Sequence, residues 1–292
     1  EDTNAQYYTS DFNSAEEMVD YGLALTQQVE AEGAALLMNN NNALPLAADA
    51  KVSTFSNSSV NLVYGGTGSG NIDASTADTL RTALEKVGVT VNPTLWDFYT
   101  VGAGKDYARS KSGTVATASE VTAEVPWDVY TDDVKNSVAQ YGDAAIVTLS
   151  RVGGEGADLA YGDVNYLALD ENEKAMLQNV AEMKKNGIVD FLKNNEYDID
   201  AALWIGDVGI SGINAVAEIL TGKVNPSGSL VDTYCYDNYS APAMWNFTPS
   251  TYEGYVEGGD VPAKSKSYMI YQEGIYVGYK YYETRYEDFV TG

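Results

Sequence analysis

The 292-residue chain contains no histidine and a single cysteine, Cys235. Without histidine it cannot form Ser-His or Cys-His nucleophile pairs, or any metal site that uses a histidine ligand. One cysteine also excludes an internal disulfide. An enzyme built from this chain would therefore have to transfer protons with carboxylates, tyrosine, lysine or a bound group.

Basic residues are scarce: 17 lysines and arginines stand against 42 aspartates and glutamates, giving a net charge of −25. This balance disfavours nucleic acid and anionic membranes as partners, because both are bound through clusters of Lys and Arg. A neutral or cationic ligand fits better, although solubility alone is the simpler explanation of the charge. No apolar run approaches the ~18 residues of a membrane span. The chain starts at Glu1 without a signal-peptide pattern, so we interpret it as a mature, processed or excised segment.

Short apolar runs alternate with helical patterns along the chain. Capping residues and apolar periodicity predict helices over residues 15–38, 75–87, 131–142, 170–187 and 211–221. The predicted caps of the first four helices are Ser14 with Glu17, Ser75, Thr131, and Asp170 with Glu173. Apolar runs predict strands at 52–55, 60–64, 89–91, 144–149, 201–206 and 275–282. With 45% hydrophobic residues available for a core, this order predicts an α/β fold, a three-layer αβα sandwich with a mostly parallel sheet.

The composition changes twice along the chain. Residues 1–29 are predicted to form a lead-in segment with the start of the first helix, and 30–235 the sandwich domain. Residues 236–292 are rich in Tyr, Gly and Pro and are predicted to add the last strand of the domain. A polar Gly/Ser/Thr/Ala insertion of low order is expected at 100–125.

One carboxylate, Glu155, lies between Gly154 and Gly156 on a loop directly after the apolar run 144–149. In open α/β sheets, ligands bind outside the carboxyl ends of the strands. The flanking glycines would allow a sharp turn and a close approach of a bulky ligand. Position alone does not separate this interpretation from an ordinary solvated loop residue.

Other signals each carry a plainer explanation. The glycine loop 65–71 follows a strand, but it fits neither Gly-x-Gly-x-x-Gly nor a P-loop, so close backbone approach is preferred to a phosphate site. The acidic cluster of Asp158, Asp163, Asp170 and Glu171 fits no EF-hand spacing, and caps or solvated loop residues explain most of it.

Four segments in order resemble glycoside hydrolase family 3, the β-glucosidase and exo-glucosidase family, in its α/β sandwich domain. They read EAEGAALLMNN running into ALPL (residues 30–46), then GEG (154–156), GKVNPSG (222–228) and YQEGIYVGYKYY (271–282). The resemblance implies a retaining enzyme in which a barrel-domain Asp is the nucleophile and Glu155 is the general acid/base. No metal or organic cofactor is implied.

The same resemblance suggests partners and supporting residues. The barrel domain would lie on the same polypeptide or on another chain, the substrate would be a β-glucoside or oligosaccharide, and a homo-oligomer stays open. Arg151 would anchor the loop or the substrate, unless it is an ordinary surface charge, and Asp158 would orient the loop. The loops 65–71 and 207–212 are the next candidates to line the domain interface.

The sequence departs from the family pattern at three places. The barrel domain is absent, and the glycine- and Phe-rich segment after the last strand is missing. A buried strand of the family pattern is lost or skipped near 187–191, and we expect a skipped or disordered segment because a lost central strand would leave ladder groups unpaired. Since the chain has no nucleophile of its own, a non-catalytic carbohydrate-binding or scaffold module is the alternative function.

Overall fold

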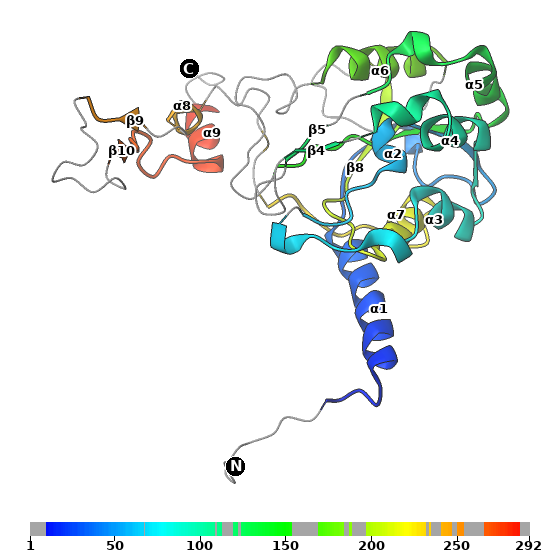
Figure 1. The fold of residues 1–292 in the computed structure, drawn as a ribbon, viewed down its shortest axis with the longest axis horizontal. Coiled ribbons are helices and arrows are strands. Elements are labelled where there is room, and N and C mark those ends of the chain that lie inside the picture. The colour runs from blue at the N-terminus through cyan, green and yellow to red at the C-terminus, as the bar shows by residue number, and fades with distance from the viewer. Residues whose placement is uncertain are drawn as a thin grey trace. The chain divides into compact units, whose positions relative to one another are not determined.

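The structure, a computed structural model, groups the chain into two compact units, residues 1–229 and 230–292 (Figure 1). No helix among the described residues is long and apolar enough to cross a membrane. The described residues are 10–66, 68–108, 110–112, 119–121, 124–153, 169–183, 187–188, 197–231, 234, 241–246, 250–253 and 266–286.

The first unit is built on a six-stranded sheet with the order β1-β8-β7-β6-β2-β3. All neighbouring strands are parallel except β1, which pairs antiparallel with β8 at one edge. This arrangement confirms the predicted mostly parallel sheet. The strands are β1 (Ala35–Asn39), β2 (Lys51–Phe55), β3 (Thr90–Val91), β6 (Ala144–Val147), β7 (Gly187–Ile188) and β8 (Ile199–Trp204).

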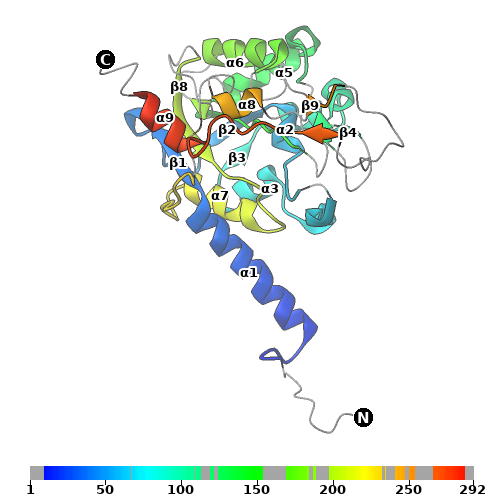
Figure 2. The same ribbon diagram turned by 90° about the vertical axis from the view of Figure 1, so that its left-hand side faces the viewer.

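Helices cover both faces of this sheet, as the sequence predicted (Figure 2). On β6, Ala144 and Ile146 join one buried cluster while Ala145 and Val147 join another, because alternate side chains of a strand point to opposite faces. The first cluster includes residues of α3 (Leu80–Lys86) and α7 (Gly212–Leu220). The second includes residues of α4 (Pro93–Thr100), α5 (Asp132–Ser137) and α6 (Glu171–Met183).

Helix α1 (Ala15–Gly33) packs on α7 and extends away from the sheet at its N-terminal end (Figure 1). Its start follows the predicted cap: the Ser14 hydroxyl accepts the Glu17 N–H at 3.1 Å. The helix was expected to run to residue 38, which is wrong. It ends at Gly33 because the next residues pair with β8 as strand β1, a tertiary contact that outweighs local helix propensity.

Two predicted strands are also wrong. Residues 60–64 contain no strand: β2 is followed by a turn at Ser56, with φ of 79°, and then by α2 (Asn57–Val60). At 275–282, Gly278 has φ of 59° and α9 (Tyr279–Tyr286) begins after it. A short aromatic run fits a strand or a helix equally, and only the flanking contacts decide.

Other elements were predicted correctly in type but begin or end at different residues. Ser75 lies in a separate 3₁₀ turn, and α3 starts later, at the cap Thr79. Strand β7 lies between β6 and β8, where the sequence suggested a missing strand, and it pairs with both. The shorter elements of this unit are η1 (Asn40–Asn42), η2 (Gly68–Gly70), η3 (Ala74–Thr76), η4 (Ala103–Tyr107), β4 (Ser110–Ser112), β5 (Ser119–Val121), η5 (Trp127–Val129) and η6 (Val138–Gln140).

The second unit contains α8 (Pro242–Trp245), α9 and a two-stranded antiparallel pair, β9 (Ser250–Thr251) with β10 (Ser267–Tyr268). The rings of Tyr252 and Tyr268 lie 4.7 Å apart and pack beside this pair. The division of the chain at 29/30 and 235/236 stays a prediction.

Glu30 is a buried acid between α1 and α7. Its side chain would contact a Cβ at Gly212, and among the described residues its Oε1 has no hydrogen-bond partner. Burial raises the pKa of Glu30 from 4.5 to about 7. Since the folded pKa lies above the unfolded one, the folded state holds the proton more tightly, and stability is lost as pH rises from about 4.5 through about 7.

We therefore expect Glu30→Gln to flatten the fall in stability over that pH window. A pKa change from 4.5 to about 7 corresponds to at most about 3–4 kcal/mol, so we expect an effect on the order of 1–3 kcal/mol. Urea unfolding midpoints at pH 5 and pH 8 measure the effect. Glu32→Gln, at an exposed position of the same helix, is the control, and equal pH dependence in both variants would contradict the assignment.

Candidate functional site

The order of the strands creates one switch point in the sheet. The chain passes from β2 outward to β3, then returns across β2 to β6, so that β2 and β6 are parallel neighbours. The connections after these two strands diverge, and such a place is where open α/β sheets bind ligands. The switch point is lined by Ser56–Asn61 after β2 and by the residues from Leu149 to Gly153 after β6.

Polar contacts join the two connections at this point. The hydroxyls of Ser58 and Ser150 lie 2.9 Å apart and share a hydrogen bond. Ser56 accepts the Ser58 N–H at 3.2 Å, which stabilises the turn with its positive φ. The residues that follow β6 are therefore tied to the residues that follow β2.

A buried carboxylate, Glu124, forms hydrogen bonds with the backbone at the turn after β2. It accepts N–H hydrogen bonds from Asn57 at 3.1 Å and from Val125 at 2.8 Å. The Tyr130 hydroxyl lies 3.5 Å away and also contacts the Tyr99 hydroxyl, which accepts the Ser56 N–H. Burial outweighs the N–H bonds and raises the pKa of Glu124 to about 7.

Glu124 is only 1% exposed, and its bonds to the backbone brace the turn. The sequence predicted this part of the chain as a polar insertion and missed the residue. No local signal marks it, because its role depends on contacts 67 residues away in the chain.

Arg151 forms a bidentate ion pair with Glu173, which lies in the first turn of α6. Its Nη1 lies 2.8 Å from Oε1, and its Nη2 lies 2.7 Å from Oε2. Glu173 also accepts the Asp170 N–H at 2.8 Å, while Asp170 accepts the Glu173 N–H at 2.7 Å. Arg151 thus has an anchoring contact, and Asp170 and Glu173 form the predicted cap of α6.

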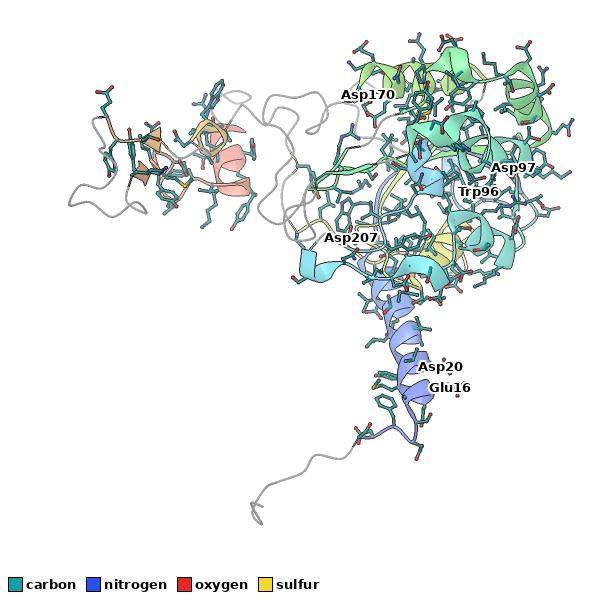
Figure 3. The ribbon with its side chains drawn as sticks, in the orientation of Figure 1. Glu16, Asp20, Trp96, Asp97, Asp170 and Asp207 are labelled. Carbon is teal, nitrogen blue, oxygen red and sulfur yellow. The ribbon has the colours of Figure 1, made fainter. Side chains whose placement is uncertain are left out.

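The structure places only some of the predicted site residues. Glu155, its neighbours Gly154 and Gly156, and Asp158 lie outside the described residues, and so does Asp163. Asp170 starts α6 (Figure 3), and Glu171 pairs with Lys174, so both have ordinary helix roles. Among the described residues, no group of acidic or cysteine side chains could hold a metal ion.

The loop 207–212 is bonded to the residues just before the loop 65–71, and the role of both loops at a domain interface stays a prediction. The N–H groups of Val208 and Gly209 donate to the carbonyls of Val63 and Tyr64 at 3.3 and 2.8 Å. Figure 3 shows Asp207 on the segment after β8. A Cβ at Gly65 would lie 2.9 Å from the Gly70 carbonyl oxygen. This close backbone approach explains the glycine at position 65.

Comparison with known proteins decides the family. The model of the glycosyl hydrolase family 3 C-terminal domain matches residues 34–279. The chain belongs to glycoside hydrolase family 3. The order of the four segments quoted above is thereby explained.

Family 3 relatives align along most of this chain. β-Glucosidase A of Butyrivibrio fibrisolvens is 30% identical over 90% of the chain, which covers 32% of that protein. A β-glucosidase of Ruminococcus albus is 28% identical over 88% of the chain, which covers 26% of it. The structure of β-glucosidase 3B from Thermotoga neapolitana in complex with glucose superposes with a TM-score of 0.71, at 25% identity, over 92% of this chain and 37% of that one. The chain thus spans about a third of the length of these family 3 proteins.

Proposed function

We propose that this family 3 chain supplies the general acid/base, Glu155, of a retaining exo-acting β-glycosidase that resembles a β-glucosidase. The observation that carries the proposal is the switch point: the segment that contains Glu155 leaves β6 at the crevice where α/β sheets bind ligands. The membership in family 3 and the names of its β-glucosidase relatives support the substrate class.

The reaction would proceed by double displacement on a terminal β-linked sugar. A barrel-domain Asp attacks the anomeric carbon while Glu155 donates its proton to the glycosidic oxygen, which leaves with the aglycone. Glu155 then removes a proton from water, and the hydroxide attacks the anomeric carbon and releases the Asp carboxylate. Such carboxyl groups lie only about 5–5.5 Å apart, so the proposed site is formed between two domains.

Each part of this scheme places a requirement on the chain. Glu155 has to be protonated near neutral pH, and partial enclosure beside the negative Asp favours that state. The nucleophile has to come from a barrel domain, on the same polypeptide or on another chain. The relatives, which are about three times as long as the segment matched here, have room for such a domain.

The test compares the chain alone with the assembled enzyme, meaning this chain together with its barrel domain, on an aryl β-glucoside. We expect hydrolysis by the assembled enzyme, none by the chain alone, and a loss of turnover with Glu155→Gln. Near-normal turnover of the amide variant would show that the acid/base assignment is wrong. Sugar binding by the chain alone, unaffected by Glu155→Gln, would instead support a non-catalytic carbohydrate-binding module.

A further inference from the structure

One carboxylate holds both flanks of the segment that contains Glu155. Arg151 lies on the N-terminal flank, directly after β6, and donates two hydrogen bonds to Glu173. Asp170 lies on the C-terminal flank, directly before α6, and its N–H donates to Oε2 of the same Glu173. The two residues on either side of this segment, Arg151 and Asp170, therefore both bond to the side chain of Glu173.

This carboxylate is enclosed by protein. The side chain of Glu173 is 1% exposed and that of Arg151 is 16% exposed, so solvent weakens the pair little. Because the planar guanidinium of Arg151 contacts both carboxylate oxygens, the pair fixes the orientation of the two side chains in addition to the distance between them. The exposed pair of Glu171 and Lys174 on the same helix has neither property, since Glu171 is 89% exposed.

The N-terminal flank is held at a second point. Arg151 Nη1 donates to the Ser150 carbonyl oxygen at 2.9 Å, and the Ser150 hydroxyl bonds to that of Ser58 in α2, which follows β2. The ion pair is thus attached at one side to the switch point and at the other to the first turn of α6. Ser58 lies in α2 and Glu173 lies in α6, so both attachments are to helices of the sandwich.

We propose that Arg151 and Glu173 are positioning residues for the acid/base step, an inference that rests on the function proposed for Glu155. The pair fixes Arg151 and Asp170, the described residues on either side of the segment that contains Glu155, so its loss would impair the acid/base step. Neither Arg151 nor Glu173 transfers a proton. A displacement of about 1 Å at a reacting group can lower a rate about 100-fold.

The test uses the assembled enzyme with Glu173→Gln, Arg151→Lys and the double variant, with Glu171→Gln as the matched control. Each is assayed on a methyl β-glucoside, whose leaving group needs a proton, and on a 2,4-dinitrophenyl β-glucoside, whose leaving group does not. We expect Glu173→Gln to lower kcat/KM for the methyl glucoside about 10- to 100-fold, mainly through kcat, with little change in kcat/KM for the dinitrophenyl glucoside.

The ratio of the two kcat/KM values does not depend on the folded fraction of a preparation, so poor folding of a variant cannot imitate the result. Because the two residues act as one unit, the double variant is expected to lose no more than the worse single variant. Glu171→Gln should keep both values.

The outcomes separate the two proposals. An equal loss on both substrates, or no loss, would overturn the positioning role while Glu155→Gln still shows the selective loss. If Glu155→Gln itself shows no selective loss, the proposed function and the positioning role both fail.

Discussion

In the assembled enzyme, Glu155→Gln is expected to lower kcat/KM for a methyl β-glucoside by about 10²–10⁴-fold, the usual contribution of a general acid. The amide keeps the size of the side chain but has no proton to donate to the departing oxygen. A dinitrophenolate leaves without protonation, so kcat/KM for that glucoside should change little. Steady-state kinetics on the two substrates measure the difference.

The second step of the reaction, hydrolysis of the glycosyl-enzyme, provides an independent test. With the base lost, hydrolysis of the glycosyl-enzyme becomes slow, so kcat and KM for the dinitrophenyl glucoside should fall together. Asp158→Asn is a useful comparison on the same segment, because Asp158 is proposed only to orient the loop. A Glu155→Gln enzyme that loses both substrates equally would argue for a structural role of Glu155.

Gly228→Ala is expected to destabilise the sandwich by about 3 kcal/mol or more, the cost of forcing an atom into a well-packed backbone contact. A Cβ at Gly228 would lie 2.2 Å from the carbonyl oxygen of Gly33 and 2.7 Å from that of Ala34. The Gly228 N–H also donates to the Ala34 carbonyl oxygen at 3.2 Å, so the backbone cannot move away without losing that bond. Urea unfolding of the variant measures the loss.

Gly22→Ala serves as the control. Gly22 lies inside α1, and no heavy atom stands within 4 Å of a Cβ placed there. This change should stabilise α1 by up to about 1 kcal/mol, because glycine is a poor helix former. Equal stability of Gly228→Ala and the unchanged protein would contradict the packing of residues 33–34 against the last residues of the first unit.

Helix starts could be predicted from the sequence because their causes are local. Ser14, Thr131 and Asp170 each accept an N–H from the residue three positions later, and each begins a helix. The buried strands β2, β6 and β8 were also predictable, because both faces of a parallel sheet are covered: β6 is apolar throughout, and β2 and β8 each contain a single charged residue.

The errors arose where distant contacts decide the structure. Residues 35–39 continue an apolar periodicity that suits a helix, yet they form β1 because β8 offers an unpaired edge. At 275–282 the tyrosines carry no period that distinguishes a strand from the turn and helix observed.

The sequence could suggest the candidate site only in part. The segment after β6 was singled out because it follows a buried strand, and the role proposed for Glu155 came from the resemblance to family 3; both stay predictions. The pairing of Arg151 with Glu173 was not predicted, because a contact over 22 residues has no sequence signature and Glu173 was recognised only as a cap partner. Glu124 was missed for the same reason.

The most direct test of the central claim is azide rescue of Glu155→Gly in the assembled enzyme. The smaller side chain leaves room for azide beside the glycosyl-enzyme formed from a 2,4-dinitrophenyl β-glucoside, and azide needs no general base. We expect azide to restore turnover, and we expect NMR to identify the product as the β-glucosyl azide, with retained configuration. An α-glucosyl azide, or no acceleration by azide, would contradict the claim that Glu155 is the acid/base of a double-displacement glycosidase.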